Sequence, residues 1–522
     1  MLDGDIKMLR RLKNYLVFQV LFIAPGILTF LTYNHSLPLF IPLTFLVWLD
    51  MTSGIFSALM YVSQYKRAKN YVPLYIIKTP SKKYRIAAFV TSFNEDPETV
   101  RGTLVSVLVA ARSYGNCDVF LLDDSTNEQI SEELRSFCEK MGVTYVHRTH
   151  RRGYKAGAIN DALRKFGEHY DLVAIFDADQ RPSPNFFHVV SAFFDDPSIA
   201  FVQVPQYYSE TYTKIAKGAW YQQMPFLRVI MRGRNLISAF SLGSGTVFRI
   251  SALREVGYLK EDTVTEDIAT SIKLHAKGYK SLYIDYPGII YGEPPLDLNA
   301  YLKQQGRWSL GGFQLLMDLL KLDLPLIVFM DYLAGVMYWF QMGLFRLIEL
   351  LAPVIFLDFN VSYLVMNPIL YSLVYFPAFI LLLILYLYSM RNYDYGLKGF
   401  FLHKTVEMLA FPSVFYSFIS WILRRRKPFT VTPKGKINVK TYLLIPYVIV
   451  LVILIVTVVI GILKILNNSS NMIKDAIVIN MFWTLYFIPY LSYGVLISLE
   501  NPKEVRRVLF KRGDLILDQK LF

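Results

Sequence analysis

Two aspartates separated by one residue, Asp177 and Asp179, follow an apolar run at 172–176. The run is too short for a helix and is bounded by charged residues, which is typical of a buried parallel strand. Ligands of open α/β sheets bind at the carboxyl ends of strands, where these two carboxylates would lie. Such oxygen ligands suit Mg²⁺ or Mn²⁺ on a diphosphate, whereas the alternative interpretation is a solvated turn rich in aspartate.

Polar residues also follow other apolar runs, which lie at 84–91, 118–122 and 143–146. These polar residues are Asn94 and Glu95, Asp123 and Asp124, and Arg152 and Lys155. Amphipathic stretches that predict helices separate the runs, at 97–113, 127–141 and 155–168. Strands that alternate with helices indicate a parallel sheet wrapped by helices, an α/β fold. We therefore expect the polar residues to gather at one edge of this sheet.

A second acidic pair, Glu266 and Asp267, lies near the start of the stretch 263–278. Its apolar spacing and its terminal Gly278 predict a helix with Thr265 near the N-cap. Acids in a first turn also complement the helix dipole and then need no catalytic role. The pair becomes a candidate for acid-base chemistry only together with the other motifs.

The stretch 304–308 places Gln304 beside Arg307 and Trp308 on one helical face. An indole offers a flat platform for a sugar ring, and Gln and Arg side chains hydrogen-bond hydroxyl or diphosphate oxygens. The alternative is that Trp308 belongs to an aromatic belt at a membrane interface.

The composition is typical of a large membrane protein. Of the 522 residues, 54% are hydrophobic, and the net charge is +14. This excess of basic residues is expected on a cytoplasmic face, and nucleic acid is not an expected partner. Cys117 and Cys138 are the only cysteines, which supports neither a disulfide framework nor a Cys-based zinc site.

Apolar runs long enough to cross a bilayer flank the polar region, at about 15–33, 39–62, 335–357, 367–389, 441–465 and 476–499. The segment 396–423 is less uniformly apolar and precedes a basic cluster at 424–427, so we expect an interfacial or re-entrant helix there. Basic clusters beside the first two runs place both termini and the polar region in the cytoplasm. The sequence therefore predicts a multi-pass protein of the plasma membrane with six spans.

These motifs together resemble the processive branch of glycosyltransferase family 2. The resemblance is carried, in this order and between membrane spans, by Asp124, by Asp177 with Asp179, by 265–267 and by 304–308. The segment 429–434, Phe-Thr-Val-Thr-Pro-Lys, looks like the gating loop of cellulose synthases. The resemblance implies a GT-A (Rossmann-like) catalytic domain at 80–320, inserted between a membrane region with two helices at 1–79 and one with four helices at 321–500. A cytoplasmic tail would follow at 501–522.

Carried over residue by residue, the resemblance assigns roles to these positions. The nucleotide would be bound by Phe93, Glu95, Asp124, Lys155 and Asp177, with Lys155 on the diphosphate. Asp179, beside Asp177, would bind Mg²⁺ or Mn²⁺. Asp267, next to Glu266, would be the general base, and the acceptor and diphosphate would be held by Gln304, Arg307 and Trp308. The gating loop would contain Phe429, Val431, Thr432 and Lys434.

A nucleotide sugar carries its own leaving group, so a cation on the diphosphate and a base on the acceptor hydroxyl suffice for one inverting displacement. The resemblance implies that UDP-glucose is polymerised into a β-1,4-glucan that leaves through the protein's own channel. Leu242 and Gln180 stand where bacterial cellulose synthases usually have Cys and His, which leaves the sugar open. Alternatives are synthesis of hyaluronan, chitin or β-mannan, transfer of a single sugar to a lipid, and a transporter with a regulatory soluble domain.

The membrane part also contains polar and aromatic candidates for a channel. Arg346 and Glu349 lie in an apolar span, where ionisable groups usually face the protein interior or a polar path. Trp339, Phe340 and Trp421 are candidates either for lining a glycan channel or for ordinary packing. The expected partners are a UDP-sugar, the growing polysaccharide, the lipid bilayer and accessory secretion subunits.

Overall fold

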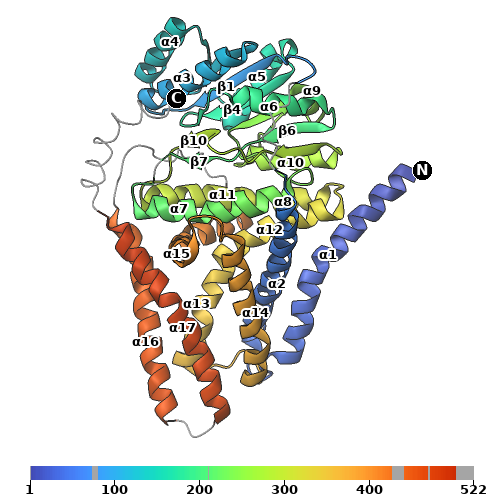
Figure 1. The fold of residues 1–522 in the computed structure, drawn as a ribbon. Helices are drawn as coiled ribbons and strands as arrows, with labels where there is room; N and C mark the ends of the chain where they lie inside the picture. Colours follow the sequence, from blue (N-terminus) through green and yellow to red (C-terminus); the bar gives the residue numbers. More distant parts are fainter. Residues whose placement is uncertain (1, 73–79, 210, 426–439, 468–470, 501–522) are drawn as a thin grey trace.

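The computed structural model describes residues 2–72, 80–209, 211–425, 440–467 and 471–500. Figure 1 shows three levels: a mixed sheet with its helices, a layer of helices lying across beneath it, and long helices below that layer. The predicted gating loop, with Phe429, Val431, Thr432 and Lys434, lies outside the described residues.

The main sheet has seven strands in the order β3-β2-β1-β4-β8-β6-β9. In chain order they are β1 (Ile86–Ser92), β2 (Cys117–Asp123), β3 (Thr144–His147), β4 (Leu172–Asp177), β6 (Ile199–Gln203), β8 (Thr246–Arg249) and β9 (Lys280–Tyr283). The first four strands are parallel, as predicted. The strand β8, which was not among the predicted strands, runs antiparallel to both β4 and β6. The carboxyl ends of β1, β2, β3 and β4 therefore meet at one edge.

The two faces of this sheet bury alternate residues of each strand. Ala88 and Val90 of β1 join one apolar cluster, whereas Ala87 and Phe89 join another. The helices that supply these clusters are α3 (Pro97–Tyr114), α4 (Glu128–Met141), α5 (Tyr154–Phe166), α6 (Phe186–Ser191) and α9 (Ile250–Glu255). Because side chains alternate along a strand, helices on both faces explain why β1 is apolar almost throughout.

A second, smaller sheet contains β5 (Arg181–Pro182), β10 (Ile290–Gly292) and β7 (Tyr207–Tyr208). The helix α10 (Glu266–Ala276) begins just after Thr265, which is its N-cap residue, as predicted. These segments lie between the main sheet and the crossing helices in Figure 1.

The crossing layer consists mainly of α7 (Lys214–Pro225), α11 (Leu298–Lys321) and α15 (Gly396–Ile422), which contact one another. Ser417 Oγ donates to the Gly306 carbonyl at 2.8 Å, and Ser413 Oγ donates to the Leu302 carbonyl at 2.8 Å. The helices approach closely, since a Cβ atom added at Gly306 would lie 2.5 Å from Ser413 Oγ. About half of the most apolar part of α15 is buried inside the protein.

Among the described residues, seven helical segments are long and apolar enough to cross a membrane by length and composition. They are Met8–Thr32, Pro38–Lys69, Leu326–Phe359, Pro368–Ser389, Gly396–Ile422, Thr441–Asn467 and Ile473–Ser498. They belong to α1 (Leu2–Thr32), α2 (Ile41–Lys69), α12 (Leu326–Phe340) with α13 (Arg346–Phe359), α14 (Pro368–Ser389), α15, α16 (Ile445–Asn467) and α17 (Asn471–Ser498). The sequence predicts six spans, one fewer than these seven segments, because it treats α15 as interfacial. This count stays a prediction.

One segment of this series is not an ordinary α-helix. Residues Gln341–Phe345 form a π-helical turn that joins α12 to α13 without a break. Such turns contain one residue more than an α-helical turn and often occur at functional sites.

A buried carboxylate ties the membrane helices to the catalytic part. Asp331 of α12 accepts hydrogen bonds from Arg67 and Gln64 of α2 and from Ser238, which follows α8 (Arg232–Arg234). Its side chain is fully buried. A charged group buried in this way is stable only with its partners, so the contact fixes α2, α8 and α12 together.

Candidate functional site

The two aspartates of the first motif lie at the carboxyl end of β4. Asp179 is buried, and its Oδ2 accepts a hydrogen bond from the Glu293 backbone at 3.1 Å. Asp177 receives backbone support from the Ser244 hydroxyl, to which its N–H donates at 3.0 Å. Both carboxylates therefore lie where the sequence predicts them, at the edge where β1 and β2 also end.

Lys155 connects this motif to the acidic helix. Its Nζ donates to Asp177 Oδ1 at 2.5 Å and to the Gly243 carbonyl at 2.7 Å. The same Nζ lies 3.9 Å from Glu266 Oε1 at the start of α10. Burial alone would lower the pKa of Lys155, but Asp177 and Glu266 raise it above its usual value. A permanent positive charge at this position is suited to a phosphate ligand.

Asp267 lies on the first turn of α10, where its Oδ1 accepts a hydrogen bond from the Ile268 backbone at 2.8 Å. Burial, and next the neighbouring Glu266 charge, raise its pKa to about 7. A carboxyl group with such a pKa can accept a proton near neutral pH and holds it more strongly than an ordinary aspartate. Gly243 leaves room for this carboxylate, because a Cβ atom there would lie 2.9 Å from Asp267 Oδ2.

The predicted nucleotide residues Asp124, Phe93 and Glu95 lie on the loops that follow β2 and β1. Asp124 is buried, and both of its carboxylate oxygens accept hydrogen bonds from Arg148. The Arg151 guanidinium lies 3.8 Å from the centre of the Phe93 ring. Glu95 is half-buried beside them. The structure thus brings an aromatic ring, a carboxylate and two guanidinium groups together.

Asp123, the neighbour of Asp124, is bonded by hydroxyl groups and not by Arg148. Its carboxylate accepts hydrogen bonds from the Ser125 hydroxyl at 2.6 Å, Ser131 at 3.2 Å and Tyr145 at 2.9 Å. These contacts shape the loop after β2, so Asp123 has a structural role, and Asp124 is the carboxylate nearer the site.

Gln304, Arg307 and Trp308 lie on α11 below the acidic helix. Gln304 and Trp308 line a cavity of about 540 Å³ together with Asp267, Leu242 and Tyr208. Arg307 is not among the residues that line this cavity, but its charge acts on Asp267 and lowers its pKa. The candidate base therefore lies at the wall of an enclosed space that a sugar ring could enter.

This first cavity extends between the membrane helices, where Trp339 also lines it. A second cavity of about 980 Å³ is lined by Arg346 and Glu349, among others. Ionisable groups in an apolar span are expected to face the protein interior in this way. The two cavities share Leu382, Tyr386, Lys404 and Glu407 as lining residues.

Phe340 and Trp421 line neither cavity. They pack on Phe313, with ring centres 5.1 and 5.9 Å away, so of the two interpretations the packing one is correct for them.

The described residues contain no group of three or more His, Cys, Asp or Glu side chains arranged to hold a metal ion. Asp177 and Asp179 nevertheless fit a cation of the kind that binds through one or two carboxylates and completes its shell with substrate phosphates and water. The donor set therefore fits Mg²⁺ or Mn²⁺ only together with a bound diphosphate.

Sequence reasoning missed Arg148, Arg151 and the 243–244 turn. Arg148 directly follows β3, so the rule that selects polar residues after strand ends would have found it. No local pattern predicts that Gly243 and Ser244 support Lys155 and Asp177.

Comparisons with known proteins agree with this geometry. Residues 172–391 match the model of the glycosyl transferase family group 2. The catalytic subunit of the UDP-forming cellulose synthase of Pseudomonas fluorescens is 26% identical over 463 residues, 82% of this chain and 58% of the relative. The corresponding subunit of Xanthomonas axonopodis pv. citri is 32% identical over 46% of this chain and 33% of the relative. A probable glucomannan 4-β-mannosyltransferase of Oryza sativa is 26% identical over 57% of this chain and 56% of the relative.

The chain thus spans between a third and three fifths of the length of these relatives. Among solved structures, a mannosyltransferase of Pyrobaculum calidifontis in complex with GDP-mannose and Mn²⁺ matches with a TM-score of 0.50 and 16% identity. The match covers 72% of this chain and 99% of that chain, and it shows a common GT-A-like fold. The family match over residues 172–391 and these relatives support the assignment of this chain to glycosyltransferase family 2.

Proposed function

We propose that the protein is a membrane-embedded, processive and inverting β-glycosyltransferase that polymerises UDP-glucose into a β-1,4-glucan. The observation that carries the proposal is the position of Asp267, which lines a cavity that runs from the start of α10 and from α11 to the helices α12, α14 and α15. An enzyme that adds one sugar to a soluble acceptor does not need a cavity that continues between membrane helices.

In this proposal the nucleotide lies at the carboxyl ends of β1, β2 and β4. Phe93, Glu95 and Asp124 bind the nucleoside, while Lys155 binds the diphosphate. Asp177 and Asp179 would hold Mg²⁺ or Mn²⁺, which on binding neutralises charge on the departing diphosphate. Lys155 must then exchange its contact with Asp177 for the phosphate oxygens.

The acceptor sugar lies in the first cavity against Trp308 and Gln304. Asp267 takes the proton of the acceptor hydroxyl while that oxygen attacks the anomeric carbon of the donor, and the bond to the diphosphate breaks. Negative charge develops on the leaving group, where Lys155 and Arg307 provide fixed positive charge. One displacement inverts the anomeric carbon, so an α-linked donor gives a β-linked product.

The product's path into the membrane is supported by the two adjoining cavities. Their shared residues include Lys404 and Glu407, whose side chains pair at 2.6 Å, and Glu407 also contacts Tyr338 at 3.2 Å. Hydroxyl, amide and charged groups along an otherwise apolar path suit a hydroxyl-rich chain. The proposed location is the plasma membrane, with the catalytic domain and both termini in the cytoplasm and accessory secretion subunits as partners.

A β-mannan is the second candidate product. Several relatives are named glucomannan 4-β-mannosyltransferases, and Leu242 and Gln180 depart from the pattern of bacterial cellulose synthases.

The deciding experiment incubates the purified protein with labelled UDP-glucose or GDP-mannose and Mg²⁺ or Mn²⁺. Polymer that a β-1,4-glucanase degrades supports the first proposal, and polymer that only a β-mannanase degrades supports the second. If neither these nor other nucleotide sugars lose their nucleotide, the protein is not a transferase, and a transporter with a regulatory domain is favoured.

A further inference from the structure

Arg148 fixes the orientation of the candidate nucleoside ligand Asp124. Its Nε donates to Asp124 Oδ1 at 2.8 Å, and its Nη2 donates to the other carboxylate oxygen. Only 8% of the Arg148 side chain is exposed. A guanidinium that binds both oxygens of a carboxylate restricts its rotation as well as neutralising it. Asp124 is therefore held in one orientation before any nucleotide binds.

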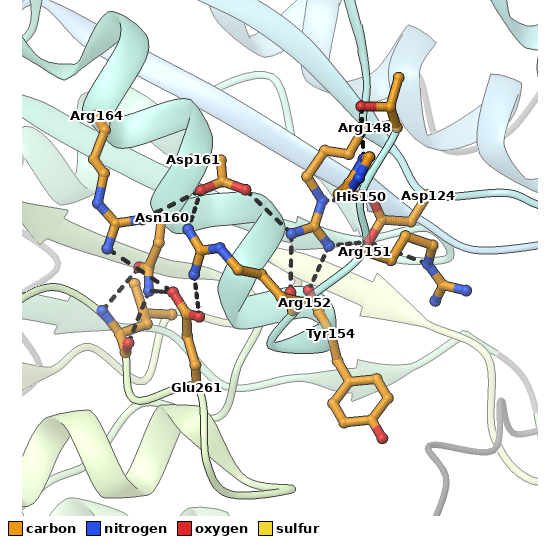
Figure 2. A network of polar contacts seen from close by, with 12 residues as sticks. Asp124, Arg148, His150, Arg151, Arg152, Tyr154, Asn160, Asp161, Arg164 and Glu261 are labelled. Atoms are coloured by element: carbon orange, nitrogen blue, oxygen red, sulfur yellow. Dashed lines mark hydrogen bonds and ion pairs between the residues drawn. The ribbon is translucent and has the colours of Figure 1, made fainter.

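The same guanidinium also holds the turn that leads to Lys155. Arg148 Nη1 donates to the Arg152 carbonyl at 2.9 Å, and Nη2 donates to the Tyr154 carbonyl at 3.0 Å (Figure 2). Gly153 and Tyr154 both have left-handed backbone conformations, with φ of 63° and 49°. Such a conformation is unfavourable for tyrosine, so the turn needs support from outside. Because Lys155 comes next in the chain, Arg148 helps to set its position.

A second set of contacts continues from this turn to the loop before α10. Arg152 pairs with both Asp161 and Glu261 (Figure 2). Asn160, which is almost fully buried, donates to Glu261 Oε1 at 2.8 Å and exchanges hydrogen bonds with the Leu259 backbone at 2.9 and 3.0 Å. Glu261 thus fastens the loop that precedes Glu266 and Asp267 to α5, the helix whose first turn contains Lys155.

We propose that Arg148 and Glu261 are positioning residues at the two ends of one network, which holds Asp124, Lys155 and the loop that leads to Asp267 in the arrangement that nucleoside binding and catalysis require. This inference rests on the proposed function. A nucleoside group that hydrogen-bonds Asp124 would meet a carboxylate that Arg148 already orients. Arg148 is also bonded to the turn whose Arg152 pairs with Glu261. Neither residue touches the reacting atoms, so both act on catalysis through the groups that they hold.

Single substitutions separate the two ends of the network. Arg148→Gln should raise the dissociation constant of UDP, measured with Mn²⁺, at least tenfold. Arg148→Lys keeps the charge, but its ammonium group has too few donors to bind both carboxylate oxygens and two carbonyls at once. Its dissociation constant for UDP should therefore lie between those of the wild type and Arg148→Gln. Glu261→Gln keeps its shape and the Asn160 contact but loses the ion pair, and it should lower kcat at least fivefold while UDP affinity changes less than twofold.

Arg164→Gln is the matched control. Arg164 reaches the same two acids, at 3.2 Å from Asp161 and 3.9 Å from Glu261, but it is half exposed. Among the described contacts it has none with Asp124 or with the carbonyls of the turn, so UDP affinity and kcat should stay near wild type.

The double variant Arg148→Gln with Glu261→Gln distinguishes one network from two independent supports. One network requires that the combined loss of kcat/KM be at least threefold smaller than the product of the single losses. A combined loss of kcat/KM that equals the product of the single losses within a factor of two would overturn the inference. If Arg148→Gln does not fold, Arg148→Lys takes its place in the double-mutant cycle. If instead the wild-type protein neither binds UDP nor releases it from a donor, the proposed function fails and not the network.

Discussion

Lys155 and Asp177 form an ion pair in which Nζ lies 2.5 Å from Oδ1, and this pair occupies the place proposed for the diphosphate. Each partner is held independently, Lys155 by the Gly243 carbonyl and the Asp177 backbone by Ser244. Binding of a cation and a diphosphate must therefore replace one contact between two well-placed groups. In the proposed function, this exchange would make nucleotide binding and metal binding mutually dependent.

Asp267→Asn should abolish sugar transfer while leaving UDP binding nearly unchanged. The substitution removes the proton acceptor without altering the proposed nucleotide and metal contacts, so its effect falls on the transition state. Turnover and UDP affinity measured on the same preparation check this expectation. Retention of more than about a tenth of the wild-type turnover would disprove the assignment, since positioned bases contribute about 10²-fold or more.

Asp179→Asn should weaken Mn²⁺-dependent UDP binding as well as turnover. The loss removes a cation ligand, so affinity without metal should change little. Titration of UDP with and without Mn²⁺ measures the difference. Asp118→Asn is the control, because Asp118 lies at the amino end of β2 and contacts Arg85 and Tyr170. Equal effects of both substitutions would contradict the metal assignment.

The acid limb of the kcat/KM profile should report the raised pKa of Asp267, about 7. Protonated Asp267 cannot accept a proton, so activity should rise as the pH increases through this value. Glu266→Gln removes a negative charge that raises this pKa, which should move the limb to lower pH.

Glu255→Gln makes the same change in charge at a residue whose carboxylate contacts Tyr279 near the far end of α10, so it should not move the limb. A profile that stays in place in Glu266→Gln would show that another group limits activity.

Gly157→Ala should lower the thermal midpoint and the UDP affinity. A Cβ atom at this position would lie 1.9 Å from the Arg152 carbonyl oxygen and 2.8 Å from Arg148 Nη1. Gly257→Ala tests backbone conformation alone, because Gly257 has φ of +78° and its Cβ would meet nothing within 4 Å. This control should cost about 1 kcal/mol and leave UDP affinity intact. An equal loss of midpoint in both variants would show that the close contact does not matter.

The predicted gating loop is tested by replacing Phe429, Val431 and Thr432 together with Ala. If the loop closes over the nucleotide sugar, polymer synthesis should fall severely at normal expression, because few core contacts are lost. Polymer yield per unit of purified protein is the measurement. Wild-type yield would favour a static connector whose basic residues meet anionic lipid.

The strands β1 to β4 were predictable from sequence within two residues, because apolar runs that end in charge specify buried strands locally. The antiparallel strand β8 was not, since its place between β4 and β6 depends on long-range pairing that no local pattern encodes. The start of α10 at Thr265 followed from its acidic first turn and apolar spacing.

The site shows the same division between local and long-range information. The positions of Asp177 and Asp179 followed from one strand end. The different surroundings of Asp123 and Asp124 did not, because Asp123 is bonded by Ser131 and Tyr145, which lie 8 and 22 residues further along the chain.

The π-helical turn Gln341–Phe345 has a consequence for the second cavity, because it precedes Arg346 and Glu349 directly. Removing one residue from it would restore ordinary α-helical winding and rotate everything that follows by about 100° about the helix axis. Arg346 and Glu349 would then turn away from the cavity, and at such a depth two charges facing hydrocarbon are strongly unfavourable. The extra residue is thus what allows one continuous helix to pack on α11 through α12 and still direct Arg346 and Glu349 into the cavity.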